Sequence, residues 1–205
     1  MPIRKNPIAP NNVYHIFNKS IAGYKIFNTH DDFLRMINSI LLFINKNQPV
    51  SRIRVRQKLI DVLAYCLMPT HLHLILREYK EGVIKALMSF LQKGYTQYFN
   101  CKYKRKGPLW ESRFRNVVVT SDEQLLHLTR YIHLNPATDY IVDDPADWLY
   151  SSYKEYLNSE SGNYGICNFE DYLEIDPEEY LQFVKDRLSY QRELSKIKHL
   201  VKELG

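Results

Sequence analysis

Two histidines separated by one leucine are the residues of this chain whose types and spacing most readily suggest chemistry. His71 and His73 flank Leu72 within the apolar stretch of residues 62–76. Side chains alternate between the two faces of a strand, so both imidazoles are expected on one face while Leu72 faces the core. Two imidazoles on one face can ligate a single metal ion. The alternative is a half-exposed strand that carries two histidines and binds no metal.

A tyrosine and an asparagine four residues apart form a second candidate pair. Tyr131 and Asn135 belong to the sequence Tyr-Ile-His-Leu-Asn-Pro, which closes a predicted helix, and this spacing places them on one helical face. A tyrosine can act as a nucleophile, but its pKa near 10 makes it weak without a nearby cation or a polarised electrophile. A metal ion on the two histidines could polarise a scissile phosphate for in-line attack by Tyr131. The alternative is a core tyrosine followed by an asparagine that ends the helix.

The candidate ligands favour a particular kind of cation. Two imidazoles completed by the amide oxygen of Asn135 leave room for phosphate oxygens and water, which suits Mg²⁺ or Mn²⁺, and Mn²⁺ tolerates imidazole better. An unrelated metallohydrolase would need an acidic residue beside the histidines, and none has a persuasive spacing. The three cysteines lie far apart and indicate neither a disulfide framework nor a CxxC zinc site.

Hydrophobic periodicity, caps and breakers predict the elements that position these residues. Strands are expected at residues 14–18, 58–67, 71–79 and within 109–120. Helices are expected at residues 30–46, 81–103, 121–135, 151–157 and 177–204. The order β, α, β, β, α, β, α predicts an α+β fold, ferredoxin-like or RRM-like, with a central antiparallel sheet and helices mainly on one face. After it, residues 158–165 read as a linker to a C-terminal helical extension.

Basic charge is concentrated in the middle of the chain. The net charge is +5, but residues 77–115 contain ten Lys and Arg against three acids, whereas residues 170–205 contain nine acids against six bases. Such a concentration suits the binding of a polyanion, and the alternative is a solvated helix face rich in lysine. Arg52, Arg54 and Arg56 alternate with apolar residues and could form either a second basic face or a solvated edge strand.

The composition is that of a folded soluble protein, with 45% hydrophobic and 25% charged residues. No stretch approaches the length of a membrane span, and residues 1–5 lack the apolar region of a secretory signal. We therefore expect a cytoplasmic protein without membrane contact.

Taken together in order, several segments resemble the single-tyrosine HUH transposases, and most closely their REP-associated branch. The segments are Tyr-His-Ile-Phe-Asn at 14–18, Leu-Met-Pro-Thr-His-Leu-His at 67–73, Gly-Pro-Leu-Trp-Glu-Ser-Arg-Phe at 107–114, Tyr-Ile-His-Leu-Asn-Pro at 131–136, and Trp148 with Ser-Ser-Tyr at 151–153. The similarity covers about residues 12–157, which we assign to an HUH single-tyrosine transposase-like catalytic domain (residues 1–157), leaving residues 158–205 as linker and extension. The family commonly has asparagine before the first histidine, where this chain has Thr70, and we expect little effect because this residue is not a ligand.

The resemblance implies a metal-dependent single-strand DNA endonuclease and strand transferase. His71 and His73 match the HUH pair that holds a divalent metal, and Asn135 matches the third ligand position. Tyr131 matches the nucleophile, which cleaves single-stranded DNA to give a 5′-phosphotyrosine and a free 3′-hydroxyl. Rejoining reverses this step with another strand, so no nucleotide cofactor is needed.

The resemblance also gives the basic stretch a substrate, which is single-stranded or hairpin DNA formed by imperfect palindromes. The candidate DNA-binding residues are Lys93, Lys102, Lys104, Arg105, Lys106, Trp110, Arg113 and Arg115. Trp110 could instead be a buried anchor. The protein would act as a monomer or a homodimer, associated with the nucleoid when it acts on DNA. The alternative from another class is a non-cleaving RRM-like module that binds structured nucleic acid, although no RNP-like string is present.

Overall fold

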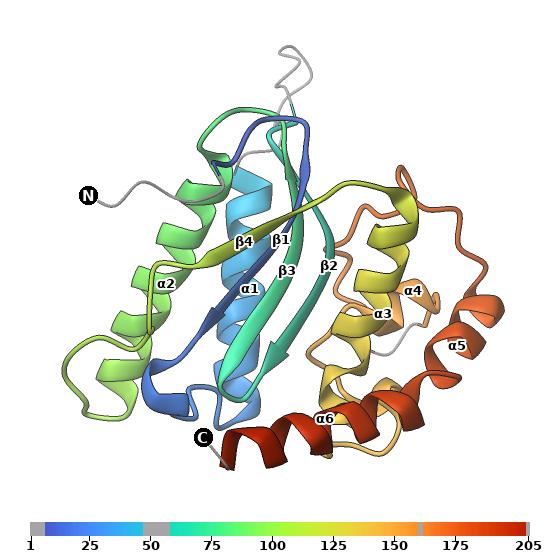
Figure 1. The fold of residues 1–205 in the computed structure, drawn as a ribbon. Helices are drawn as coiled ribbons and strands as arrows, with labels where there is room; N and C mark the ends of the chain where they lie inside the picture. The colour runs from blue at the N-terminus through green and yellow to red at the C-terminus, as the bar shows by residue number, and fades with distance from the viewer. Residues whose placement is uncertain (1–6, 47–57, 160–161, 204–205) are drawn as a thin grey trace.

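All four strands form a single antiparallel sheet (Figure 1). The computed structural model describes residues 7–46, 58–159 and 162–203. The strands are β1 (Val13–Lys19), β2 (Ile60–Met68), β3 (His71–Glu78) and β4 (Arg115–Val119), in the order β2-β3-β1-β4. This arrangement confirms the predicted α+β, ferredoxin-like fold. Arg52, Arg54 and Arg56 lie outside the described residues.

The two faces of the sheet are covered by different helices. Figure 1 shows α1 (His30–Lys46) and α2 (Val83–Lys102) against one face, while α3 (Asp122–Thr138) packs beside β2 on the other side. The sequence explains the first packing, because Leu72, Leu74 and Leu76 alternate along β3 and are fully buried. The remaining elements are η1 (Ile21–Gly23), η2 (Pro145–Asp147), α4 (Tyr153–Tyr156), α5 (Pro177–Lys185) and α6 (Leu188–Glu203).

Two helix boundaries differ from those expected. The helix predicted to end at Asn135 continues through Pro136 to Thr138 as part of α3. A proline removes one backbone hydrogen bond from a helix, but Asn135 and Pro136 are both buried here, so packing outweighs that loss. The helix predicted over residues 177–204 is two helices, because α5 ends at Lys185 and α6 begins at Leu188.

The C-terminal extension packs into the same hydrophobic core as the sheet. Phe169, Tyr180 and Val184 are buried in this core. The buried carboxylate of Glu155 accepts hydrogen bonds from the backbone N–H groups of Ile166 and Cys167. These contacts attach the extension to the region that carries α3. No helix in the described part of the chain is long and apolar enough to cross a membrane.

Candidate metal and nucleophile site

Strand β3 places both candidate ligands on the face of the sheet that α1 and α2 leave uncovered. His73 lies opposite Phe17 of β1 and Cys66 of β2, and His71 lies two residues away on the same face. The centroids of the two imidazole rings are 5.0 Å apart. The tight turn at residues 69–70 fixes this position, because it joins β2 directly to the start of β3. The alternation predicted from the sequence is therefore what brings the rings together.

Each of these histidines has one nitrogen in a contact and one without a partner. Nδ1 of His71 lies 3.0 Å from Oγ1 of Thr70, and Nδ1 of His73 lies 2.8 Å from Nε2 of His15. Among the described residues, no group forms a hydrogen bond with Nε2 of either ring. Burial lowers the pKa of His71 to about 4 and that of His73 well below its usual value. Both rings are thus neutral at pH 7, which is the form that binds metals.

Helix α3 brings Tyr131 against one of these histidines, His73. The Tyr131 ring meets the His73 ring edge-on, with centroids 6.1 Å apart and an interplanar angle of 85°. The side chain is 38% exposed, so it lies at the surface of the site and can reach a substrate in solvent. Burial raises the pKa of the phenol, so it is protonated at neutral pH unless a cation lies nearby.

Asn135 lies one helical turn beyond Tyr131 and is buried without a partner. Its side chain is 9% exposed, and its Nδ2 atom makes no hydrogen bond with the described residues. A buried amide without a partner is costly, and such groups often mark a place where a ligand completes the hydrogen bonding or coordination. The unpartnered atom is an N–H group, which marks incomplete hydrogen bonding, whereas a metal would bind the amide oxygen. The residue types present, two neutral imidazoles and an amide, fit the donor set expected for Mg²⁺ or Mn²⁺.

Acidic ligands do not contribute to this donor set. No group of three or more His, Cys, Asp or Glu side chains placed to hold a metal is found in the described ranges. A metal bound here would therefore take its third protein ligand from another residue type, and Asn135 is the candidate.

The structure divides the basic candidates into engaged and exposed groups. Lys102 forms a 2.7 Å ion pair with the buried Asp32. The guanidinium of Arg105 donates to the carbonyl groups of Gly107 and Pro108. Trp110 is buried and its indole N–H donates to the carbonyl of Gln92, as in the anchor alternative. Exposure alone does not separate these groups, because Lys102 is itself exposed, as are Lys93, Lys104, Lys106, Arg113 and Arg115.

Among the exposed candidates, Arg115 lies nearest to the histidine face. It pairs with Phe17 across β1 and β4, and Phe17 in turn lies opposite His73. Arg115 and Lys19 help line a cavity of about 130 Å³ at the end of β1, together with Phe17, Asn18, Glu111 and Ser112. Lys93 and Lys102 instead belong to α2, on the other face of the sheet (Figure 1).

Sequence reasoning missed three neighbours of the site. It gave Thr70 and His15 no role, and it did not single out Lys19, which pairs with His71 across β1 and β3. Alternation along residues 14–18 shows that His15 and Phe17 share a face. Only the register between β1 and β3 shows that this face is the one that carries His73.

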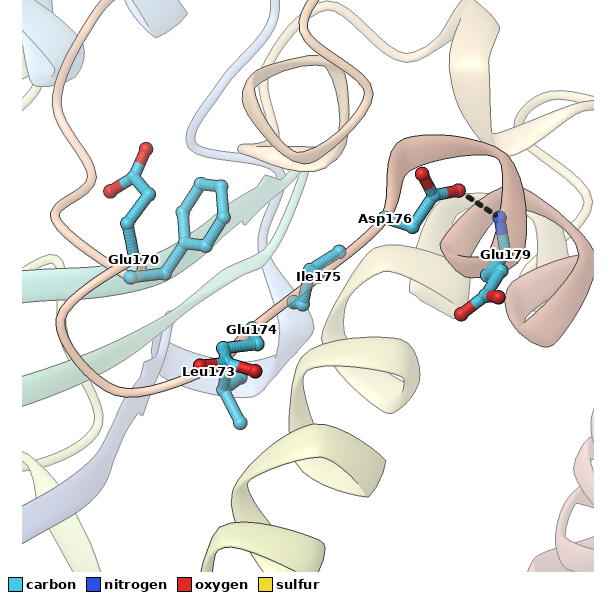
Figure 2. A pocket seen from close by; sticks show the side chains of 7 residues that line it. Glu170, Leu173, Glu174, Ile175, Asp176 and Glu179 are labelled. Carbon is cyan, nitrogen blue, oxygen red and sulfur yellow. Dashed lines mark hydrogen bonds between the residues drawn. The ribbon is translucent and has the colours of Figure 1, made fainter.

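A larger hollow lies in the C-terminal segment, and its charged side chains are acidic. It has a volume of about 670 Å³ and is lined by Glu170, Glu174, Asp176 and Glu179 with three apolar residues (Figure 2). The Asp176 carboxylate caps α5 by accepting hydrogen bonds from the backbone N–H groups of Glu178 and Glu179. The remaining carboxylates repel a phosphate backbone, so this hollow is unsuited to DNA.

Known proteins share both the sequence pattern and the fold. Residues 45–135 match the family model described as "Transposase IS200 like". A protein of Haemophilus influenzae named "Putative REP-associated tyrosine transposase" is 27% identical over 111 residues, which span 49% of this chain and 62% of that relative. The match thus leaves more than a third of the relative uncovered. These comparisons confirm the resemblance seen in the motifs.

A solved structure supports the fold. Its title reads "Structure of the REP associates tyrosine transposase bound to a REP hairpin", and it aligns with a TM-score of 0.59 at 16% identity. The alignment covers 86% of this chain and 93% of that chain. At this level of identity the likeness shows that the two proteins share a fold.

Proposed function

We propose that this chain is a transposase, because it is similar to the IS200-like and REP-associated tyrosine transposases. It would act as a metal-dependent single-strand DNA endonuclease and strand transferase. One observation carries this proposal: the ring of Tyr131 meets that of His73, while the Nε2 atoms of both histidines and the Nδ2 atom of Asn135 lack partners within the described structure. Structural histidines and a structural asparagine would have these nitrogen atoms satisfied.

The proposed ligands of the metal are His71, His73 and Asn135. The two neutral imidazoles would bind through Nε2, and the amide of Asn135 through its oxygen. When bound, Mg²⁺ or Mn²⁺ would supply the positive charge that polarises the scissile phosphate. The protein contributes a rigid strand for the first two ligands and a packed helix for the third.

Tyr131 would then carry the covalent step. Its phenolic oxygen forms a bond to phosphorus as the bond from phosphorus to the 3′ oxygen breaks, which gives a 5′-phosphotyrosine. The phenol loses its proton and the leaving 3′ oxygen gains one, so the products are the protein-linked strand and a free 3′-hydroxyl. Attack by another 3′-hydroxyl reverses the step, because the phosphotyrosine conserves the energy of the phosphodiester bond.

The proposed substrate is single-stranded DNA, or a hairpin formed by an imperfect palindrome. Exposed basic residues would contact the phosphate backbone, with Arg115 the most direct because it lies on the histidine face. Lys102, Arg105 and Trp110 already bind protein groups, and we expect them to contribute by holding α2 and the following loop. The protein would work in the cytoplasm, on the nucleoid, as a monomer or homodimer.

A denaturing-gel assay tests this function. End-labelled hairpin DNA from the regions flanking the gene is incubated with protein in Mn²⁺, Mg²⁺ or EDTA, with Tyr131→Phe and Tyr140→Phe run alongside. Tyr140 is the matched control, because it is an exposed tyrosine just beyond the end of α3. We expect a protein-linked band that needs metal and Tyr131. A gel shift without a covalent band in any metal, across all flanking hairpins, would favour a non-cleaving binding module.

A further inference from the structure

The two candidate ligands have different partners on their second ring nitrogen. Nδ1 of His71 contacts a hydroxyl, that of Thr70, whereas Nδ1 of His73 contacts another imidazole, that of His15. A hydroxyl can either donate or accept a hydrogen bond, so it accommodates either tautomer of His71. A neutral imidazole has one donor nitrogen and one acceptor nitrogen. The contact between His15 and His73 therefore requires that one of the two contacting nitrogens carries a proton and the other does not.

The position of His15 makes this contact specific. His15 pairs directly with Ile75 across β1 and β3, so its ring reaches diagonally to His73 on the same face. The two rings are nearly parallel, with an interplanar angle of 19° and centroids 5.1 Å apart, and Phe17 packs against the His15 ring with centroids 5.0 Å apart. The 2.8 Å contact joins Nε2 of His15 to Nδ1 of His73, so these two rings meet edge to edge. The packing of Phe17 helps to hold His15 in the orientation that this contact needs.

We infer that His15 is a positioning residue that selects the metal-binding tautomer of His73. If His73 binds the metal through Nε2, its proton must lie on Nδ1, and Nε2 of His15 then accepts that proton in a hydrogen bond. His15 must in turn carry its own proton on Nδ1. Hydrogen bonding to the second nitrogen of a ligating histidine fixes its tautomer and orientation, and raises its basicity as a ligand. This inference rests on the proposed function, because it concerns the ligands of the same site.

Two substitutions separate the hydrogen bond from the shape of the ring. His15→Phe keeps an aromatic ring packed on Phe17 but removes the acceptor nitrogen. His15→Gln loses the ring but can present an amide oxygen near the position of Nε2. His30→Phe is the matched control, because His30 lies at the start of α1, where its ring contacts the hydroxyl of Tyr150 away from the site.

The primary measurement is the Mn²⁺ affinity of the DNA-free protein by isothermal titration calorimetry. We expect His15→Phe to weaken binding by about 10- to 100-fold, the usual effect of losing an outer partner of a ligand. His15→Gln should recover most of this loss, and His30→Phe should bind as the wild type does. Hairpin binding in EDTA and the thermal unfolding midpoint show whether each variant is folded.

The tautomer itself can be read without metal, from two-bond ¹H–¹⁵N spectra of the histidine side chains. We expect the proton of His73 on Nδ1 in the wild type and a mixture of tautomers in His15→Phe.

A proton on Nε2 of His15, donated to His73, would overturn the inference. So would wild-type Mn²⁺ affinity in a folded His15→Phe variant, while the proposed function would stand. Loss of binding in both His15 variants would make His15 a direct ligand and also overturn the positioning role. Absence of Mn²⁺ binding in the wild type would count against the proposed function itself, and the inference would fall with it.

Discussion

The histidines of the core and those of the candidate site differ in how their ring nitrogens are satisfied. His133 is fully buried, with Nδ1 2.8 Å from the hydroxyl of Tyr180 and Nε2 2.8 Å from that of Ser152. His71 and His73 each have a partner on Nδ1 only. A histidine with both nitrogens satisfied is part of the packing, whereas a buried histidine with one free nitrogen is available to a ligand. This difference separates the candidate metal site from the core.

The satisfied histidine still serves the site indirectly. His133 lies between Tyr131 and Asn135 on α3, and its two contacts join this helix to α5 and to the segment before α4. The hydroxyl of Tyr180 also donates to Thr129 of α3. The C-terminal extension therefore fixes the helix that carries the proposed nucleophile.

The largest predicted effect distinguishes the two groups by metal binding. His73→Ala should weaken Mn²⁺ binding by more than about 100-fold, because it removes a ligand and not only an outer partner. His133→Gln should change the affinity by no more than about threefold, because His133 is not a ligand and glutamine can still form hydrogen bonds in its place. Isothermal titration calorimetry measures both values. Equal losses in the two variants would remove the distinction between them.

The free energy of unfolding should rank the two histidines in the reverse order, with His133 the more important. His133→Ala leaves a cavity and removes a partner from two buried hydroxyl groups, so we expect it to lower the free energy of unfolding by about 3 kcal/mol. His73→Ala should cost less than this, because only one nitrogen of the ring that it removes has a partner. Urea unfolding in EDTA tests this order. A larger loss in His73→Ala would show that His73 is a structural histidine.

The dependence of the free energy of unfolding on pH, below neutral pH, tests the same comparison. Burial lowers the pKa of His133 to about 3, whereas an unfolded histidine titrates near 6.5. Below pH 6.5 the unfolded chain binds a proton that the folded chain does not, so stability is complete above this pH and falls as the pH drops towards 3. One such group contributes a slope of about 1.4 kcal/mol per pH unit.

A variant isolates the share of His133 in this slope. His133→Gln should lower the slope of the free energy of unfolding against pH, between pH 4 and 6, by the share of about one titrating group. Urea unfolding in EDTA measures this slope. Burial also lowers the pKa of His15 to about 4, and this contribution is the same in both proteins. An unchanged slope would mean that His133 is protonated in the folded state.

The smallest predicted effect distinguishes Arg115, on the histidine face, from Lys102, which is paired with a buried carboxylate. Arg115→Ala should weaken hairpin binding by about 3- to 10-fold and reduce its salt dependence by about one ion, because it removes one phosphate contact. Lys102→Ala should change DNA affinity by no more than about twofold but destabilise the fold by about 1–2 kcal/mol, because Asp32 loses its cation. Lys85→Ala, an exposed change on α2, is the control. A larger effect on DNA binding from Lys102→Ala would place the DNA on the α2 face.

The sequence predicted much of this site because its main geometry is local. Strand alternation places His71 and His73 on one face, and helical spacing does the same for Tyr131 and Asn135, without knowledge of the rest of the fold. The contact between His15 and His73 depends on the register of β1 against β3, which alternation alone does not determine. The partners of His133 lie 19 and 47 residues away, so no local pattern marks it as a satisfied core residue.

The roles of the basic residues could likewise be predicted only in part from the sequence. Their concentration in residues 77–115 predicts an affinity for a polyanion, but it does not show which side chains are already engaged. Lys102 binds Asp32 from α1, and that pairing depends on how α1 and α2 pack. The position of Arg115 beside Phe17 likewise follows from the pairing of β4 with β1.

A crystal of the protein soaked in Mn²⁺ would test the central claim most directly, through an anomalous difference map collected at the manganese edge. We predict a single strong peak within ligand distance of Nε2 of His71, Nε2 of His73 and the amide oxygen of Asn135, close to Tyr131. No peak is expected at His133. A peak elsewhere, or none at these three ligands in crystals of the folded wild type, would contradict the assignment of this face as the metal centre.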